Sequence, residues 1–430
     1  MTIKKEETEV ITSANTLRGY LRDDGRKGIR NVVAVAYLVE CAHHVASEVV
    51  LEFRKMSEPS LCVHLIGFPG CYPNVYAEQM MERLLTHPNV GAVLLVSLGC
   101  ESMNKRHLEQ AVRASGRPVH TLTIQETGGT RSTIAKGVEW VQWALASLRL
   151  QKTVTMALSE LVVGTICGGS DGTSGITANP AIGRAFDLLI EQGSVCIFEE
   201  TGELVGCEFH MQKRAVTPEL GEEIVKCVAK AARYYSIMGH GSFAVGNAEG
   251  GLTTQEEKSM GAYAKSGRSP IDGIIKPGYV STPEGKNGGL YLLDVVPDGE
   301  PRFGFPNIAD NAEIVELIAC GSHVILFSTG RGSVVGSAIS PVIKVCANTE
   351  TYKKMTDDMD INAGRILDGE GTLEEVGQEI FDLVQQVSRG IKSKSEDLGH
   401  QEFILTYKSF DPVGPSCLPA GTRMRSLNSA

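Results

Sequence analysis

A thiol, a hydroxyl and a carboxylate follow one another closely at Cys167, Ser170 and Asp171. They follow an apolar run that opens with the β-branched-rich residues 161–163 and stops at Cys167, which predicts the end of a buried strand. The intervening glycines allow a tight turn and a close approach of backbone to a ligand. Because ligands of open α/β sheets bind at the carboxyl ends of strands, this turn is a candidate binding site. The alternative is a structural strand-to-helix corner, since such turns also occur without function.

Two further cysteines, Cys71 and Cys100, also follow predicted strands, and each stands beside a glycine. Glu101 lies next to Cys100, and Asp171 lies four residues after Cys167. Thiolates and carboxylates together are suitable ligands for iron, manganese or zinc. The chain has no CxxC or HxxxH spacing that would support a metal site independently. The alternative is that the three cysteines are small buried thiols, as free cysteines usually are.

Arg331 follows another predicted strand, between two glycines. A guanidinium in this position can pair bidentately with a substrate carboxylate, and the alternative is a surface loop arginine. The chain contains no Walker loop, and the glycines that follow residue 330 lack the Rossmann spacing, so we expect no nucleotide cofactor. No histidine of the chain has a sequence cue that links it to a nucleophile.

The elements that must position these side chains alternate between apolar strands and helices. This order predicts an α/β fold with βαβ units and mostly parallel sheets, in two doubly wound, Rossmann-like domains. We predict a polar lead-in at residues 1–14, a first domain at 15–150 and a second domain at 151–400. The second domain is expected to carry a loop-rich insertion around residues 239–311, and residues 401–430 an extended tail. Asn179 and Pro180 predict the start of a helix, as N-cap and first helical residue.

The whole-chain composition excludes several functional classes. The 430 residues carry a net charge of −10, which disfavours binding to nucleic acid and to an anionic membrane surface. The chain start lacks the apolar core of a signal peptide, and no apolar run is long enough to span a membrane. The 11 cysteines lack the spacing of a disulfide framework, which favours a reduced, cytoplasmic protein.

Several blocks resemble the altronate dehydratase and galactarate dehydratase family. The resemblance covers roughly residues 17–390, and its most specific parts are CGGSDGTSGITANPA and NAEGGLTTQEEKSMG. It implies a metal-dependent lyase that uses Fe²⁺ or Mn²⁺ to remove water from a sugar acid, giving a 2-keto-3-deoxy acid. The implied metal ligands are Cys71, Cys100 and Cys167, with Glu101 and Asp171 as ligand or base. The implied substrate-binding residues are Gly168, Gly169, Ser170, Asn247 and Arg331.

The chain departs from that family in two places. Members often have a histidine-rich HxHGC-like segment, where this chain keeps Cys71 but reads Ile-Gly-Phe-Pro-Gly before it. The small SAF-type domain of the family has no counterpart in residues 1–14, so we expect a separate SAF-type small subunit and an oligomeric enzyme. Two alternatives remain open. One is a related lyase or hydrolase on another hydroxy acid, such as sulfolactate with sulfite as leaving group. The other is a non-catalytic large subunit.

Overall fold

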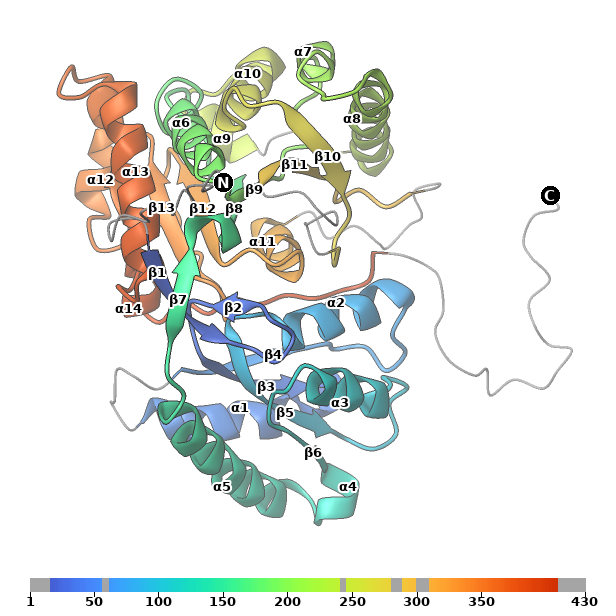
Figure 1. Ribbon diagram of the computed structural model, residues 1–430. Coiled ribbons are helices and arrows are strands. Elements are labelled where there is room, and N and C mark those ends of the chain that lie inside the picture. Colours follow the sequence, from blue (N-terminus) through green and yellow to red (C-terminus); the bar gives the residue numbers. More distant parts are fainter. Residues whose placement is uncertain (1–15, 56–61, 240–244, 280–287, 299–308, 409–430) are drawn as a thin grey trace, which may run out of the picture.

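The computed structural model describes residues 16–55, 62–239, 245–279, 288–298 and 309–408. Two parallel sheets, each with helices on both faces, form the two halves of the molecule (Figure 1). The predicted α/β fold with βαβ units is therefore confirmed. The predicted lead-in lies outside the described residues, as does the predicted tail beyond residue 408. No helix in the described ranges combines the length and the apolar character needed to cross a bilayer.

The smaller sheet has the strand order β4-β3-β5-β6, and all neighbours are parallel. Its central strand β5 is buried along its whole length, as a parallel strand covered on both faces must be. The elements of this half are β3 (Val32–Tyr37), α1 (Glu40–Arg54), β4 (Val63–Gly67), α2 (Val75–Leu85), β5 (Val90–Ser97), α3 (Lys105–Ala114), β6 (Val119–Thr123), α4 (Ile124–Thr127) and α5 (Thr130–Arg149). Helices α1 and α5 cover one face, and α2 and α3 cover the other.

The larger sheet has seven parallel strands in the order β10-β11-β9-β8-β12-β13-β14. Its strands are β8 (Val162–Cys167), β9 (Val195–Phe198), β10 (Ile271–Ile275), β11 (Gly289–Leu293), β12 (Val324–Thr329), β13 (Val342–Cys346) and β14 (Ile361–Asn362). The chain adds strands on one side of β8 and then returns to its other side with β12. The strand order reverses at β8, which makes the gap between β8 and β12 the topological switch point.

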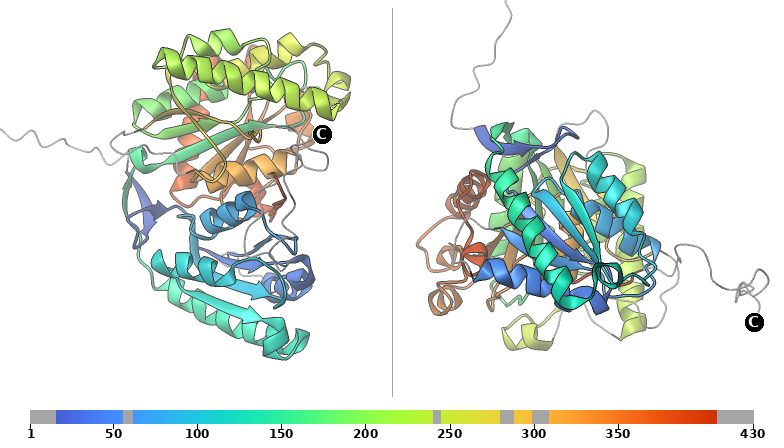
Figure 2. Two further views of the ribbon diagram at one scale, coloured as in Figure 1. Left: turned by 90° about the vertical axis from the view of Figure 1, so that its right-hand side faces the viewer. Right: turned by 90° about the horizontal axis from the view of Figure 1, so that it is seen from below.

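The helices around this sheet leave it buried on both faces (Figure 2). They are α6 (Ala178–Glu191), α7 (Glu208–Gln212), α8 (Pro218–Met238), α9 (Val245–Glu249), α10 (Gln255–Lys265), α11 (Asp310–Ala319), α12 (Thr349–Lys354), α13 (Leu373–Ser388) and α14 (Lys394–Asp397). Short 3-10 turns occur at Leu158–Glu160 and Gly364–Ile366. Helix α6 packs between α10 and α13, and α11 packs under β8.

The stretch 239–311, expected to be a loop-rich insertion, contains α9, α10 and the sheet strands β10 and β11 in its described parts. Strand β11 pairs with β9, and β10 pairs with β11, so both strands belong to the larger sheet. One sequence-based expectation needs correction in this half. Helix α6 begins at Ala178, so Asn179 and Pro180 lie inside its first turn and are not its cap. Proline is tolerated there because first-turn amide groups have no partner within the helix.

A small antiparallel sheet joins the two halves. Strand β1 (Thr16–Leu21) pairs with β2 (Lys27–Gly28) on one side and with β7 (Val154–Ala157) on the other. Arg22, which belongs to the cation-rich turn of the sequence, is buried and donates to the carbonyl oxygens of Pro88 and Arg30 at 2.8 and 3.1 Å. Arg30 forms a bidentate pair with Glu396, at 2.7 and 2.9 Å. Arg22 therefore ties the small antiparallel sheet to the smaller half, and Arg30 fastens the smaller half to α14 of the larger half.

A continuous apolar core also connects the halves. It runs from α2 of the smaller half to α11 of the larger half, which pack against each other. The segment 401–408 passes between them (Figure 1). Within it, the Tyr407 hydroxyl donates to the carbonyl of Tyr72 at 2.7 Å, and Lys408 forms a buried ion pair with Glu316 at 2.8 Å. The two sheets are thus held in a fixed arrangement by both apolar and ionic contacts.

A buried histidine lies at the same junction. His323 Nδ1 accepts from the Val162 amide at 3.0 Å, and its Nε2 is 2.9 Å from the carbonyl oxygen of Lys27, so the ring is held neutral with its proton on Nε2. The pKa of His323 is lowered from 6.5 to about 4, mainly by burial and also by Arg26, against the two backbone bonds and Glu160, which raise it. Burial also lowers the pKa of the neighbouring His87 well below its usual value.

We predict that the fold loses stability as the pH falls below 6.5. The unfolded chain takes up a proton on His323 below that pH, whereas the folded chain does not until about pH 4. The contribution of His323 to this loss of unfolding free energy reaches about 2 kcal/mol at pH 5, since one pKa unit corresponds to about 1.4 kcal/mol. Chemical unfolding between pH 7 and 5 measures it. His323→Asn, whose side-chain oxygen replaces Nδ1, should show a shallower pH dependence, and equal slopes would contradict the prediction.

Candidate active site at the carboxyl edge of the larger sheet

Acidic and thiol groups meet where β8 and β9 end. Strand β8 ends at Cys167, and the neighbouring β9 is followed by Glu199 and Glu200. Because the two strands run parallel, these residues lie at the same edge of the sheet. The Cys167 thiol lies 3.6 Å from a carboxylate oxygen of Glu200. Ligand atoms of Cys167, Glu200 and Glu203 all lie within 4.8 Å of one another. These groups, together with Asp310 and Glu313 of α11, make this edge strongly acidic.

Two lysines of α10 reach into this acidic group from above the sheet edge. Lys258 Nζ lies 3.1 Å from Cys167 Sγ, 3.3 Å from Ser170 Oγ and 3.9 Å from a carboxylate oxygen of Glu203. Lys265 forms an ion pair with Glu200 in which both side chains are fully buried. The two lysines are seven residues apart, so they lie on the same face of the helix. Helix α10 therefore supplies the positive charge that the buried strand ends lack.

The surroundings raise the pKa values of Glu203, Cys167 and Lys258. Burial raises the pKa of Glu203 to about 7, and Lys258 opposes this shift. Burial, with Glu200, also raises the pKa of the Cys167 thiol, against the effect of Lys258 and Lys265. Burial would lower the pKa of Lys258, but Cys167, Glu203 and Glu200 outweigh it and raise the pKa. Lys258 is therefore a charged ammonium in this site.

The chemistry of the donor set fits a divalent metal ion. One sulfur and two carboxylates within 4.8 Å of one another are a suitable ligand group for Fe²⁺, Mn²⁺ or Zn²⁺. The acidic side chains outnumber the lysines Lys258, Lys265 and Lys408, so a cation would offset the remaining negative charge. A metal at this place would bind the thiolate form of Cys167 and would require Lys258 to withdraw from the sulfur. Among the described residues this is the one group of three or more such ligands.

The glycines of the turn after β8 are required by close packing. A Cβ on Gly168 would lie 2.0 Å from Asp310 Oδ2, and Gly169 has a φ of +61°. The turn is pinned to the end of β12 by backbone bonds, in which Gly330 and Arg331 donate to the carbonyl of Gly169 at 3.1 and 2.8 Å. The predicted binding turn therefore lies directly at the topological switch point, next to Arg331.

The structure brings the predicted substrate-binding residues together. The Arg331 guanidinium donates to the carbonyl of Gly246 and lies 3.3 Å from Glu249, so it reaches the short helix α9, which carries Asn247. The Gly172 amide donates to the carbonyl of Gly250 at 3.1 Å, which joins the end of α9 to the turn. Ser170 also contacts Lys258. The turn after β8, helix α9 and Arg331 thus surround one place, and their role in substrate binding stays a prediction.

Asp171 is surrounded by donors within its own turn. Its Oδ1 accepts from the Thr173 amide at 2.9 Å, from the Thr173 hydroxyl at 2.7 Å and from the Ser174 hydroxyl at 3.0 Å. Its Oδ2 accepts from Asn348 at 3.3 Å. A carboxylate with this many donors stabilises the turn. Its predicted role as ligand or base is not tested by this arrangement.

The remaining predicted residues lie in the smaller half, outside the Cys167 group. Cys71 and Cys100 are exposed, and neither belongs to the metal-ligand group of Cys167. Glu101 accepts from the Ser97 hydroxyl and from the Gly99 amide, the latter at 2.8 Å. Sequence spacing placed these residues at strand ends, but they belong to a different sheet from Cys167. Their roles as ligand or base stay predictions.

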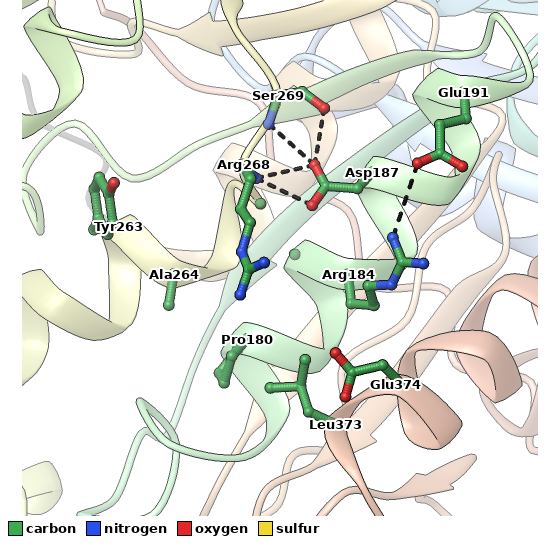
Figure 3. A pocket seen from close by; sticks show the side chains of 12 residues that line it. Pro180, Arg184, Asp187, Glu191, Tyr263, Ala264, Arg268, Ser269, Leu373 and Glu374 are labelled. Carbon is green, nitrogen blue, oxygen red and sulfur yellow. Dashed lines mark hydrogen bonds and ion pairs between the residues drawn. The ribbon is translucent and has the colours of Figure 1, made fainter.

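A cavity of about 750 Å³ lies behind the site, between α6, α10 and α13 (Figure 3). None of the thiol, acidic or lysine side chains of the site lines it, so it is not the place where the acidic and basic groups meet. Within it, Asp187 of α6 accepts from the Arg268 and Ser269 amides at 2.9 and 3.0 Å. These bonds tie the chain just after α10 to α6, and they fix the helix that carries Lys258 and Lys265.

Four residues of the site were missed from the sequence: Glu200, Glu203, Lys258 and Lys265. A signal was present for the two acids, because EETGE follows directly after the apolar strand β9. For the lysines, the signal was a spacing of seven residues on one helix face. What the sequence lacks is any indication that α10 docks over the ends of β8 and β9.

Comparison with known proteins matches both halves to one family. Residues 19–149 match the family model "D-galactarate dehydratase/Altronate hydrolase, second domain", and residues 158–410 match "D-galactarate/Altronate dehydratase, C-terminal". The (2R)-sulfolactate sulfo-lyase subunit beta of Chromohalobacter salexigens is 34% identical, over 91% of this chain and 97% of its own length. Galactarate dehydratase (L-threo-forming) of Escherichia coli is 31% identical, over 89% and 74%. Altronate dehydratase of Bacillus subtilis is 30% identical, over 90% and 76%.

We predict that Gly168→Ala destabilises the protein by about 1–3 kcal/mol, the usual cost of overpacking. The new Cβ would lie 2.0 Å from Asp310 Oδ2 and 2.5 Å from Phe327 Cζ. Removing the carboxylate with Asp310→Ala should recover part of this loss, so the two substitutions should be non-additive in chemical unfolding. Gly246→Ala is the matched control, because its Cβ would meet only Arg331 Nη1 at 3.5 Å. Strict additivity would show that the two residues do not compete for space.

Proposed function

The chain belongs to the D-galactarate/altronate dehydratase family, a family of lyases, and from this premise we propose that it eliminates water from a sugar acid. The substrate is a 2,3-dihydroxy acid of the altronate or galactarate type, and the product is a 2-keto-3-deoxy acid. One observation carries the proposal: a thiol, two carboxyl groups and a lysine ammonium meet at the switch point of the larger sheet. The names of the dehydratase relatives support the same reaction.

We propose that Cys167, Glu200 and Glu203 hold Fe²⁺ or Mn²⁺. When bound, this ion supplies a Lewis acid that stabilises the negative charge formed when the proton beside the carboxylate leaves. The chain's own contribution is to hold the three donors at one sheet edge before the ion arrives. Lys265 contributes by fixing Glu200, and α10 closes the site over them.

Lys258 is suited to assist the leaving group. Its ammonium is retained because the surrounding acidic groups raise its pKa, and it points at Ser170 and Cys167 within 3.3 Å. A charged amine in this place can give a proton to a departing hydroxyl, which then leaves as water while the enol relaxes to the keto acid. Arg331 and the turn of Gly168, Gly169 and Ser170 are proposed to hold the substrate carboxylate, with Asn247 beside them. The base stays with the predicted carboxylates, Asp171 or Glu101.

A second substrate is favoured by a specific observation. The relative with 34% identity, whose length is 97% covered, is named a (2R)-sulfolactate sulfo-lyase subunit beta. Sulfolactate is also a 2-hydroxy acid, and loss of its α-proton with sulfite as leaving group again gives an enol that relaxes to a keto acid. The ammonium of Lys258 would then stabilise the departing anion. The word "subunit" in that name also supports our proposal that a SAF-type small subunit completes the enzyme.

The test of the function is a substrate panel. We would assay altronate, galactarate and (2R)-sulfolactate with Fe²⁺ or Mn²⁺, with and without a SAF-type small subunit, and measure keto acid and sulfite. We expect turnover of one class of substrate and loss of about one bound divalent ion per chain in Cys167→Ala. Cys62→Ala, a half-buried cysteine of the smaller half, is the control. A folded, metal-loaded protein that turns over none of the three acids would contradict the proposal.

Arg331→Lys tests the substrate-binding assignment. We predict a fall in kcat/KM of about 10-fold or more, because the loss of one charge-assisted hydrogen bond costs roughly 1.5–3 kcal/mol. Steady-state kinetics measures it. Arg268→Lys is the control, since Arg268 is an exposed arginine that lines the separate cavity of Figure 3. If Arg331→Lys and the control have the same rate and KM as the unsubstituted enzyme, Arg331 does not bind the substrate.

A further inference from the structure

The exposed cysteines of the chain gather at one edge of the smaller sheet. Among the cysteines that the structure describes, Cys41, Cys71 and Cys100 are the exposed ones. Cys41 lies in the first turn of α1 just after β3, Cys71 follows β4, and Cys100 follows β5. These strands are direct neighbours, in the order β4-β3-β5, and run parallel. The three thiols therefore stand at the carboxyl ends of three adjacent strands.

Backbone hydrogen bonds hold the three cysteine-bearing loops together. The Glu40 amide, next to Cys41, donates to the Pro69 carbonyl at 3.0 Å. The Ser102 amide, two residues after Cys100, donates to the carbonyl of Cys71 itself at 2.8 Å. The loop after β4 is thus bonded to both of the others. The thiols are displayed by one connected layer of backbone, not by three independent surface loops.

Packing does not account for this arrangement. A free cysteine normally behaves as a small apolar side chain and is buried. This chain follows that rule at Cys196, Cys227, Cys320 and Cys346, which are all buried. An exposed free thiol adds no core contact and is open to oxidation. Three exposed thiols at one sheet edge, beside the positive end of α1, have the placement of metal-ligating thiolates.

We propose that Cys41, Cys71 and Cys100 together ligate an iron–sulfur cluster. A single tetrahedral ion would require its sulfur ligands to lie about 3.8 Å apart, given metal–sulfur bonds of about 2.3 Å. In the described part of the chain, only the Cys167 group has three candidate ligand atoms within 4.8 Å of one another, so at least one pair of these three sulfurs lies farther apart than 4.8 Å. A cluster of several iron and sulfide atoms spans such a wider triangle, and cysteine thiolates are its usual ligands.

Glu101, which follows Cys100 in the chain, does not compete with the three thiols as a ligand of the cluster. Both of its carboxylate oxygens already accept hydrogen bonds, from the Ser97 hydroxyl and the Gly99 amide. Three thiolates leave a four-iron cluster with one iron that has no cysteine ligand. Segment 401–408 lies beside Cys71, because Tyr407 bonds to the neighbouring Tyr72, and Lys408 of the same segment bonds to Glu316 in the larger half. The cluster would therefore lie on the side of the smaller sheet that segment 401–408 connects to the larger half.

The test is to purify the full chain without oxygen and to reconstitute it with Fe³⁺, sulfide and a thiol reductant, which reduces part of the iron to the mixed Fe²⁺ and Fe³⁺ state of a cluster. We expect iron together with acid-labile sulfide, and a visible charge-transfer absorption, in the unsubstituted protein. Cys41→Ala, Cys71→Ala and Cys100→Ala should each lower the sulfide content several-fold. Cys62→Ala and Cys167→Ala should both retain the sulfide. Since Cys167→Ala removes the divalent ion of the proposed function, this readout separates failure of the cluster from failure of that proposal.

Thiol labelling covers the case in which a variant does not fold. In the unsubstituted protein, mass spectrometry should find Cys41, Cys71 and Cys100 alkylated without reconstitution and protected after it. Cys196, which is buried, serves as the internal control. Iron without acid-labile sulfide would point to a single ion and overturn the cluster. Equal labelling of the three thiols before and after reconstitution would overturn the site itself.

Discussion

The buried ion pair between Lys265 and Glu200 is the interaction on which the site depends. Both side chains are cut off from solvent, and an unpaired charge in such a place would cost several kcal/mol. Glu200 is brought there by the end of β9, and Lys265 by the last turn of α10. Helix α10 is therefore held against the sheet edge by charge, and Asp187 of α6 fixes the chain just behind it. Lys258, on the same helix face, is placed over Cys167 as a consequence.

The same physical requirement explains why acid and base are so concentrated at this edge. Parallel strands end together, so every polar residue that follows a strand is brought toward the same place. In the larger sheet these residues come from β8, β9 and β12, on both sides of the switch point. Close contacts at Gly168 and Gly330, where a Cβ would meet Asp310 and Asp171, keep the turns tight against each other. The result is a small, mostly buried polar site on an otherwise apolar sheet.

In both halves, chemically reactive side chains stand at the carboxyl ends of parallel strands, but their types differ. In the larger half the strand ends hold carboxylates, lysines and one buried thiol, whereas in the smaller half they hold exposed thiols. Arg30 and Lys408 connect the halves through buried or half-buried ion pairs, and α2 packs on α11. Family membership fits this organisation, since separate family models match residues 19–149 and 158–410. The relatives named as dehydratases and as a sulfo-lyase subunit share an elimination from a hydroxy acid.

The sequence by itself determined the fold class, the positions of most strands, the family, and the turn after β8 as a candidate binding site. It could do so because hydrophobic periodicity and glycine spacing are local properties, and because the family blocks are continuous in the chain. Only the tertiary structure decided which strand ends share an edge. It separated Cys71 and Cys100 from Cys167, and it joined Cys167 to Glu200 and Lys258, which are distant in sequence. Sheet order and helix docking arise from long-range packing and buried charge pairing, and a single sequence does not show these contacts.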